Sequence, residues 1–251
     1  MKRLLLSTLG TILVIWGLPI GVKALQYQND GIAWYEADNS ASNLAPDPAS
    51  ESRAVVQVYA ARTFRWRSIF AVHTWIVVKR ENSPDYDRWD VVGWGGGKVV
   101  RKDWSTPDAL WYGAKPEVLV DIRGEEAAKL IPKIEQAIAS YPYESTYKSY
   151  PGPNSNTFTA HIGREVPQLG LDLPPTAIGK DYRPLSSPVG LAPSGSGVQL
   201  SLLGLFGVTA ALEEGVEVNL LGFSAGVDIK DPALRLPAVG RLGTSGATLQ
   251  R

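Results

Sequence analysis

The residues YPGPNSNTF, at positions 150–158, decide how the middle of this chain folds. The first four form a Pro/Gly turn, and Asn154 and Ser155 follow at a point where a helix can begin. Both are residue types that favour the N-cap position of a helix. The sequence therefore predicts a short helix over residues 157–166, which ends at Pro167.

Ser155 has two interpretations at this position. The positive end of the helix dipole favours a developing alkoxide and any oxyanion beside it, which suits a nucleophilic serine. Alternatively, Asn154 and Ser155 only cap the helix. The residue types alone favour capping, because Asn and Ser are preferred cap residues.

Strands are expected on the N-terminal side of this helix. Alternation of side chains places His73 and Trp75 on one face of the second strand and Thr74 and Ile76 on the other. Short connections between these strands indicate antiparallel pairing. The glycine-rich connection at 93–97 is expected to be a hairpin turn rather than a phosphate-binding loop. The expected strands are 54–59, 69–78, 88–94, 98–101 and 117–122.

A second helix is expected over residues 124–141, because apolar residues recur there at helical spacing. Glu125 and Glu126 favour its N-terminus through the helix dipole. Pro132 lies inside it and should bend it or delay its start. We expect an amphipathic helix that covers the sheet.

The composition excludes several classes of function. Of 251 residues, 25 are Lys or Arg and 25 are Asp or Glu, so nothing favours a nucleic-acid partner. The absence of cysteine removes disulfides, thiolate metal sites and a cysteine nucleophile. With two histidines as well, we expect no metal site and no cofactor.

The N-terminus resembles a targeting segment. A short basic region precedes an uncharged, mostly apolar run over 4–22, which is just long enough to cross a bilayer. We interpret residues 1–25 as a signal anchor, or as a signal peptide cleaved after Ala24. Basic residues stay on the cytoplasmic side, so the remainder would face the envelope. Residues 26–53 have the composition of a polar linker.

The C-terminal part contains a long loop and two apolar arms. Residues 168–197 are dense in Pro, Gly and Ser; within them, Lys180 and Asp181 are either an anion-binding pair or an exposed ion pair. Residues 198–212 and 216–229 predict a β-hairpin with one apolar face, packed on the main sheet or on a bilayer surface. We expect an irregular tail over 231–251. The expected domain covers residues 54–196, and residues 197–251 are expected to extend the same domain as a hairpin and a tail.

Two family resemblances follow from these blocks. His73 on a strand, Asp90 on the next strand and then Asn-Ser-x-x-Phe at 154–158 resemble the order in circularly permuted papain-like enzymes. That group includes lecithin retinol acyltransferase-like proteins and permuted envelope peptidases. Most of residues 54–245 also resembles an uncharacterised bacterial envelope family known only as a domain of unknown function. Its blocks here are 152–158, 177–182 and 214–222.

The papain-like resemblance implies an α+β fold, in which two helices pack on an antiparallel sheet and a C-terminal β-hairpin follows. It implies a hydrolase or acyltransferase that acts on an amide or ester bond of an envelope peptide or lipid. Ser155 stands where those enzymes have cysteine, with His73 as the base, Asp90 orienting the imidazole, and the backbone N–H groups of 155–157 receiving the oxyanion. The residues expected to bind substrate are Asn154, Asn156, Thr157, Trp75 and Lys180.

The envelope resemblance implies an anchor in a bacterial inner membrane with the domain facing the periplasm, or secretion to the periplasm if the chain is cleaved after Ala24. A catalytically inactive binding or scaffolding domain is the alternative function. A third possibility is a lipid-surface protein that uses the 198–229 hairpin. No nucleic-acid partner is expected in any of these cases.

Overall fold

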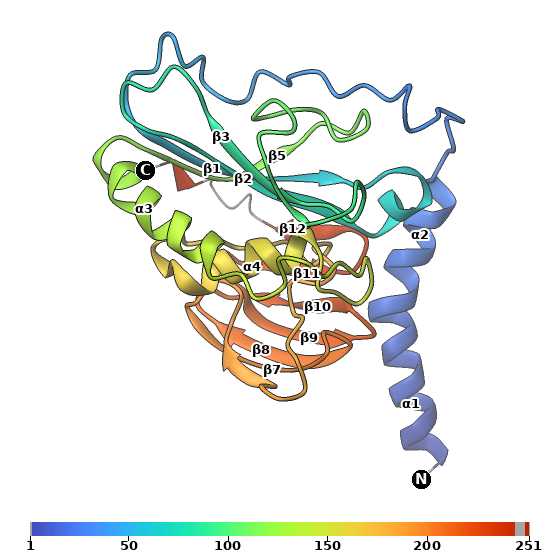
Figure 1. The fold of residues 1–251 in the computed structure, drawn as a ribbon. Coiled ribbons are helices and arrows are strands. Elements are labelled where there is room, and N and C mark those ends of the chain that lie inside the picture. The colour runs from blue at the N-terminus through green and yellow to red at the C-terminus, as the bar shows by residue number, and fades with distance from the viewer. Residues whose placement is uncertain (1, 244–248, 251) are drawn as a thin grey trace.

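The computed structural model describes residues 2–243 and 249–250. Two β-sheets enclose a layer of helices, and a long N-terminal helix runs down one side of the molecule (Figure 1). This is an α+β fold with antiparallel sheets, as the sequence predicts at that level.

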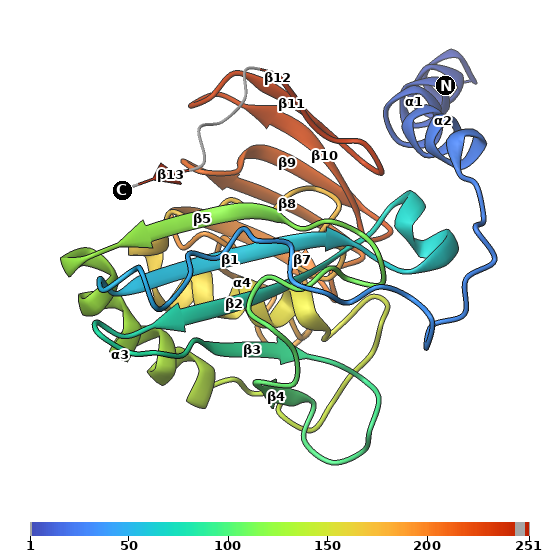
Figure 2. The same cartoon turned by 90° about the horizontal axis from the view of Figure 1, so that it is seen from above.

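Over the described residues, the first sheet contains six strands, the five predicted ones and β13, in the order β13-β5-β1-β2-β3-β4. All its pairs are antiparallel except β13 with β5, and Figure 2 shows β5, β1, β2 and β3 side by side. The predicted strand over 69–78 starts only at Val72, because Arg65–Ile69 form a 3-10 helix, η2. The strands are β1 (Val55–Arg62), β2 (Val72–Lys79), β3 (Asp87–Val91), β4 (Val100–Lys102), β5 (Glu117–Arg123) and β13 (Leu249–Gln250).

Each face of the first sheet contributes to a separate apolar core. Ile76 faces the helices in the larger core, whereas Trp75 faces a smaller aromatic core that includes Tyr59 and Trp111. The predicted alternation along β2 is therefore correct. The segment predicted as a polar linker covers the aromatic side, where the Asp108 carboxylate accepts the backbone N–H groups of Leu44 and Ala45.

The helical layer consists of α3 (Glu125–Ala139), α4 (Ser155–Glu165) and the short 3-10 helix η3 (Pro167–Leu169). Pro132 does not delay the start of α3. It lies on the exposed side of the helix, where the carbonyl left without a partner can face water.

The second sheet corrects the prediction of one hairpin and an irregular tail. Each predicted arm folds back on itself, because Leu203-Gly204 and Leu221-Gly222 both adopt positive φ and form tight turns. The tail supplies two further strands. The result is a seven-stranded antiparallel meander of β6 (Val189–Leu191), β7 (Gly197–Leu202), β8 (Phe206–Ala211), β9 (Gly215–Leu220), β10 (Phe223–Asp228), β11 (Ala233–Leu236) and β12 (Gly240–Gly243).

The N-terminal helix comprises α1 (Lys2–Ile12), a π-helical turn η1 (Leu13–Gly17) and α2 (Leu18–Gln26). Its stretch from Leu5 to Gln26 is long and apolar enough to cross a membrane, and only 6% of its most apolar window is buried. By length and composition it can serve as a membrane anchor or as a signal sequence.

Candidate functional site

The first turn of α4 is fixed by Asn154. Its Oδ1 accepts the N–H groups of Asn156 at 3.0 Å and Thr157 at 3.2 Å, and the Thr157 hydroxyl accepts the N–H of Asn154 at 3.1 Å. These reciprocal bonds form a capping box. Asn154 is therefore the cap, and Ser155 is the first helical residue rather than a second capping residue.

Two polar groups of Ser155 remain without a partner. Within the part of the chain that the structure describes, neither its hydroxyl nor its backbone N–H makes a hydrogen bond, although the residue is only 4% exposed. Its carbonyl accepts the hydroxyl groups of Thr159 at 3.1 Å and Thr74 at 3.4 Å. A hydroxyl and an N–H donor therefore lie together at the positive end of α4.

Asn156 attaches this turn to β2. Its amide donates to the carbonyl of Val72 at 3.0 Å, and its Oδ1 accepts the hydroxyl of Thr74 at 2.9 Å. These two partners flank His73. The start of α4 is thus held against the backbone on both sides of the histidine.

The structure brings His73 and Asp90 together. Nε2 of His73 lies 2.7 Å from Oδ1 of Asp90. Arg88 donates to both carboxylate oxygens, at 2.5 Å to Oδ2 and 3.2 Å to Oδ1, and the Trp104 indole donates to Oδ2 at 3.0 Å. The imidazole stacks on Trp111 with ring centroids 3.6 Å apart.

The charges around His73 determine which ring nitrogen carries the hydrogen. Burial alone would raise the pKa of Asp90, but the charge of Arg88 and the hydrogen bond from His73 hold it below its ordinary value. The carboxylate is therefore ionised and only accepts hydrogen bonds, so Nε2 of His73 carries the hydrogen. Burial lowers the pKa of His73, which leaves a neutral ring with a lone pair on Nδ1.

No hydrogen bond joins His73 to Ser155 among the described residues. The His73 ring lies with Trp75 and Trp111 in the aromatic core, whereas the neighbouring Thr74 side chain contacts α4. The two predicted catalytic residues are thus connected through the backbone around residues 72–74 and not through their side chains.

The expected substrate-binding side chains are buried and have partners inside the protein. Asn154 and Asn156 donate to the carbonyl of Ile178, and Thr157 donates to that of Gly179. Trp75 donates its indole N–H to the carbonyl of Pro107 at 2.8 Å. In this arrangement these groups position the 176–182 loop and the aromatic core.

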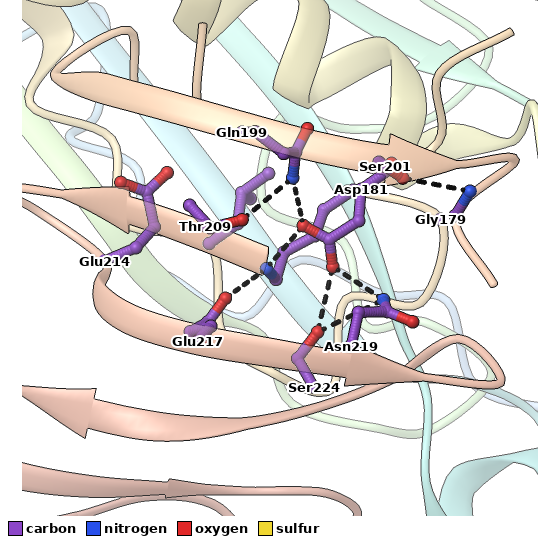
Figure 3. Close-up of polar contacts among 12 residues, drawn as sticks. Gly179, Asp181, Gln199, Ser201, Thr209, Glu214, Glu217, Asn219 and Ser224 are labelled. Carbon is purple, nitrogen blue, oxygen red and sulfur yellow. Dashed lines mark hydrogen bonds and ion pairs between the residues drawn. The ribbon is translucent and has the colours of Figure 1, made fainter. Parts of the chain in front are cut away.

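Lys180 corrects both interpretations given to it. It is neither exposed nor open to an anion, because it is 1% exposed and bonds Asp181 at 3.0 Å and Glu217 at 2.5 Å. Asp181 in turn accepts hydrogen bonds from Gln199, Asn219 and Ser224 (Figure 3). The pair belongs to a buried polar network between the 176–182 loop and the second sheet.

Sequence reasoning assigned no role to Arg88, Trp104 or Trp111. Arg88 lies two residues before Asp90, so strand alternation places both side chains on one face; this signal was available. The tryptophans belong to a long loop, whose return to the sheet no local pattern predicts.

A cavity of about 690 Å³ is lined by the end of α2, the segment that follows it, the connection from β1 to β2, and residues 112–114. Arg62, which pairs with Val72, and Tyr112, next to Trp111, are among its lining residues. Lys23 and Arg65 add positive charge, and Asp38 adds negative charge. The described residues contain no group of three or more His, Asp or Glu side chains able to hold a metal ion.

Comparison with known proteins identifies one family. Residues 53–182 match the model of the family described as proteins of unknown function, DUF3750. No curated protein and no solved structure was found to match the chain, and the papain-like resemblance gains no support from these comparisons. The match spans strands β1 to β5, helices α3 and α4, and the loop up to Tyr182, which is more than half of the chain. The protein therefore belongs to the DUF3750 family.

Proposed function

We propose that this protein is a serine-dependent hydrolase or acyltransferase that acts on an amide or ester bond. Ser155 is the nucleophile, His73 the general base and Asp90 the residue that orients the base. The observation that carries the proposal is the Asp90–His73 hydrogen bond at 2.7 Å, since it leaves the Nδ1 lone pair of a neutral imidazole available to take a proton.

The hydroxyl of Ser155 suits this role because it makes no hydrogen bond to any described residue that would have to break before it reacts. Rotation about its χ1 angle therefore costs no hydrogen bond. The side chains of Ser155 and His73 still have to approach, and hydrogen bonds at catalytic sites commonly form only when substrate is bound. The contacts of Asn156 with residues 72 and 74 hold the start of α4 beside the backbone on both sides of His73.

In the proposed reaction, the Ser155 oxygen attacks the acyl carbon while its proton passes to Nδ1 of His73. The carbonyl oxygen becomes an oxyanion beside the unpaired N–H of Ser155. The N–H groups of Asn156 and Thr157 are not available, because Asn154 accepts both. The tetrahedral intermediate then breaks its bond to the leaving group, which takes the proton from His73. Water or an acceptor hydroxyl resolves the acyl-serine by the reverse steps.

The substrate is proposed to be a peptide, amide or lipid ester of the cell envelope. The cavity lined by Arg62 is the approach proposed for the substrate, since Arg62 on β1 pairs with Val72, the residue before His73. A membrane anchor at the N-terminus would hold the site near envelope substrates, with the domain on the periplasmic side of a bacterial inner membrane.

The alternative proposal is a catalytically inactive binding domain. Two contacts favour it: Arg88 neutralises the charge of Asp90, and Trp111 covers one face of the His73 ring. In that case Ser155 has no chemical role, and the His73–Asp90 pair only stabilises the aromatic core.

Labelling with a fluorophosphonate, which reacts with activated serines, separates the two. The full-length protein in detergent is compared with Ser155→Ala, His73→Gln and Ser50→Ala, an exposed serine that serves as the control. The enzyme proposal predicts no labelling of Ser155→Ala, at least a hundredfold slower labelling of His73→Gln, and an unchanged rate for the control. Equal labelling of wild type and Ser155→Ala, or none in folded wild type, would favour the binding domain.

A further inference from the structure

The second sheet has its apolar side chains on the outside. Along β7, Val198, Leu200 and Leu202 are exposed, whereas Gln199 and Ser201 are buried. The same inversion continues in β8 and β9, where valines at 208, 216 and 218 are exposed and Thr209, Glu217 and Asn219 are buried.

The cross-strand pairing joins these exposed residues into continuous rows. One row crosses all seven strands, from Leu191 to Leu242, and a second crosses four. We call the two rows the outer apolar face; it contains no charged side chain, and its valines and leucines are 42–63% exposed. The rows are Leu191, Val198, Ala210, Val216, Val227, Leu234 and Leu242, and Val189, Leu200, Val208 and Val218.

The buried polar network fixes which face of the sheet points outward. Arg235 reaches inward to Asp172 at 2.6 Å, Glu217 at 2.6 Å and the carbonyl of Leu173 at 2.7 Å. Lys180, in the 176–182 loop, bonds Glu217, and Figure 3 shows Glu217 among the polar contacts with the neighbouring residue Asp181. Turning the sheet over would leave these charges unpaired, so the apolar rows must face away from the domain.

The outer apolar face is among the largest apolar patches expected on a monomeric soluble protein, and patches of that size are often functional. Seven strands at about 4.8 Å spacing extend roughly 29 Å across. Its area is on the order of 500 Å², which is at the upper end of the largest apolar patches found on monomeric soluble proteins. Such a surface indicates an apolar partner.

The N-terminal helix indicates what that partner is. The Trp16 indole donates to the carbonyl of Phe223, the first residue of β10, at 2.8 Å. Trp16 lies in the middle of the apolar stretch from Leu5 to Gln26, so the sheet stands beside this stretch and not beyond its end. Figure 1 shows the helix passing the second sheet, which forms the bottom layer of the molecule, with its N-terminal half extending below. A lipid layer deep enough to cover the helix therefore reaches the sheet.

We infer that the outer apolar face is inserted into the same lipid leaflet that surrounds the N-terminal helix. The face supplies no charge that would resist insertion, and its backbone N–H and C=O groups are paired within the meander, so entry into lipid leaves few polar groups unsatisfied. The helix and the sheet then form one membrane-contacting surface. This inference does not depend on the proposed catalytic function.

Single-cysteine labelling tests the inference directly, because the natural chain contains no cysteine. Val208→Cys and Val216→Cys place an environment-sensitive NBD label on the outer apolar face, and Glu81→Cys places it on an exposed turn of the first sheet as the control. The full-length variants are reconstituted in phosphatidylcholine vesicles with or without doxyl-labelled lipid, after circular dichroism has shown native folding.

We expect blue-shifted emission and severalfold stronger doxyl quenching at positions 208 and 216 than at 81, with the opposite order for quenching by aqueous iodide. Equal iodide quenching at all three positions would overturn the inference. Protection from both quenchers, together with disulfide-linked dimers of the unlabelled Val208→Cys variant, would assign the face to a second copy of the chain instead.

Discussion

The imidazole of His73 donates a hydrogen bond to the Asp90 carboxylate, and Arg88 already balances the negative charge of that carboxylate. All three groups are buried. Because the guanidinium neutralises the carboxylate, the histidine does not have to be protonated for the cluster to be stable. The arrangement therefore holds a neutral, oriented imidazole, which is the form that a general base requires.

Ser155→Ala is expected to leave stability within about 0.5 kcal/mol of wild type, because the lost hydroxyl makes no hydrogen bond among the described residues. Asn154→Ala is expected to cost about 1–2 kcal/mol, since it removes the cap of α4 and the bond to Ile178. Urea unfolding of the two variants measures this contrast. A loss of more than about 1 kcal/mol for Ser155→Ala would assign that residue a structural role.

Asp90→Ala is expected to destabilise the fold by about 3–5 kcal/mol, because it leaves the Arg88 charge buried without its partner. Asp87→Ala is the matched control on the same strand; its ion pairs with Arg80 and Lys102 lie at the surface and are worth about 0–1 kcal/mol. Thermal unfolding of both variants gives the comparison. Equal losses of stability in the two variants would show that the buried Arg88–Asp90 pair contributes no more than a surface ion pair.

The pH dependence follows from the lowered pKa of His73. Burial shifts it below the ordinary value of 6.5, so the ring stays neutral to a lower pH than a free histidine. The rate of fluorophosphonate labelling should be constant above pH 6.5 and fall only below that value. His161→Gln is the control, since burial also lowers the pKa of His161 but that residue is not part of the site. A half-maximal rate above pH 6.5 would contradict this assignment.

The lowered pKa of His73 also makes the folding stability depend on pH. The unfolded chain takes up the proton near pH 6.5 and the folded chain only at lower pH, so the unfolded state binds more protons between the two values. The contribution of His73 to stability is therefore complete above pH 6.5, declines as the pH falls from 6.5 to the folded pKa, and levels off below it. Unfolding of wild type and His73→Gln across this window should show a shallower decline in the variant.

Lys180→Met tests the buried polar network. Asp181 and Glu217 would each lose a buried partner, so we expect a loss of about 3–5 kcal/mol. Lys98→Met, at a surface ion pair with Glu144, should change stability by less than about 1 kcal/mol. A small effect at position 180 in urea unfolding would mean that the network does not hold the second sheet to the helical layer.

The sequence predicts the first sheet and both helices because their signals are local. The cap at Asn154, the helical spacing before Tyr141 and the alternation along β2 each depend on residues within a few positions. The second sheet was underestimated because its turns are Leu-Gly pairs inside apolar runs, which do not resemble the usual Asn-Gly turns. The alternation of apolar and polar residues also does not identify which face of a strand is buried. The outward position of the valines therefore follows only from the complete structure.

The sequence predicts the part of the candidate site that depends on neighbouring strands, but not the part that depends on residues distant in the sequence. His73 and Asp90 lie on strands whose pairing the short connection indicates, and the structure brings them together. The partners of Lys180 are Asp181, the next residue, and Glu217, which is 37 residues later. No local pattern predicts that such a distant carboxylate returns to bury the lysine.

Ser155 is proposed to be an activated nucleophile, and the site at which a fluorophosphonate attaches tests this role. Folded full-length protein is treated with the probe and digested, and the modified residue is located by mass spectrometry, with urea-denatured protein as the control. We expect a phosphonyl group on Ser155 in the folded protein and none on Ser155 in the denatured protein. An unmodified Ser155 in folded protein, whether or not another serine reacts, would contradict it.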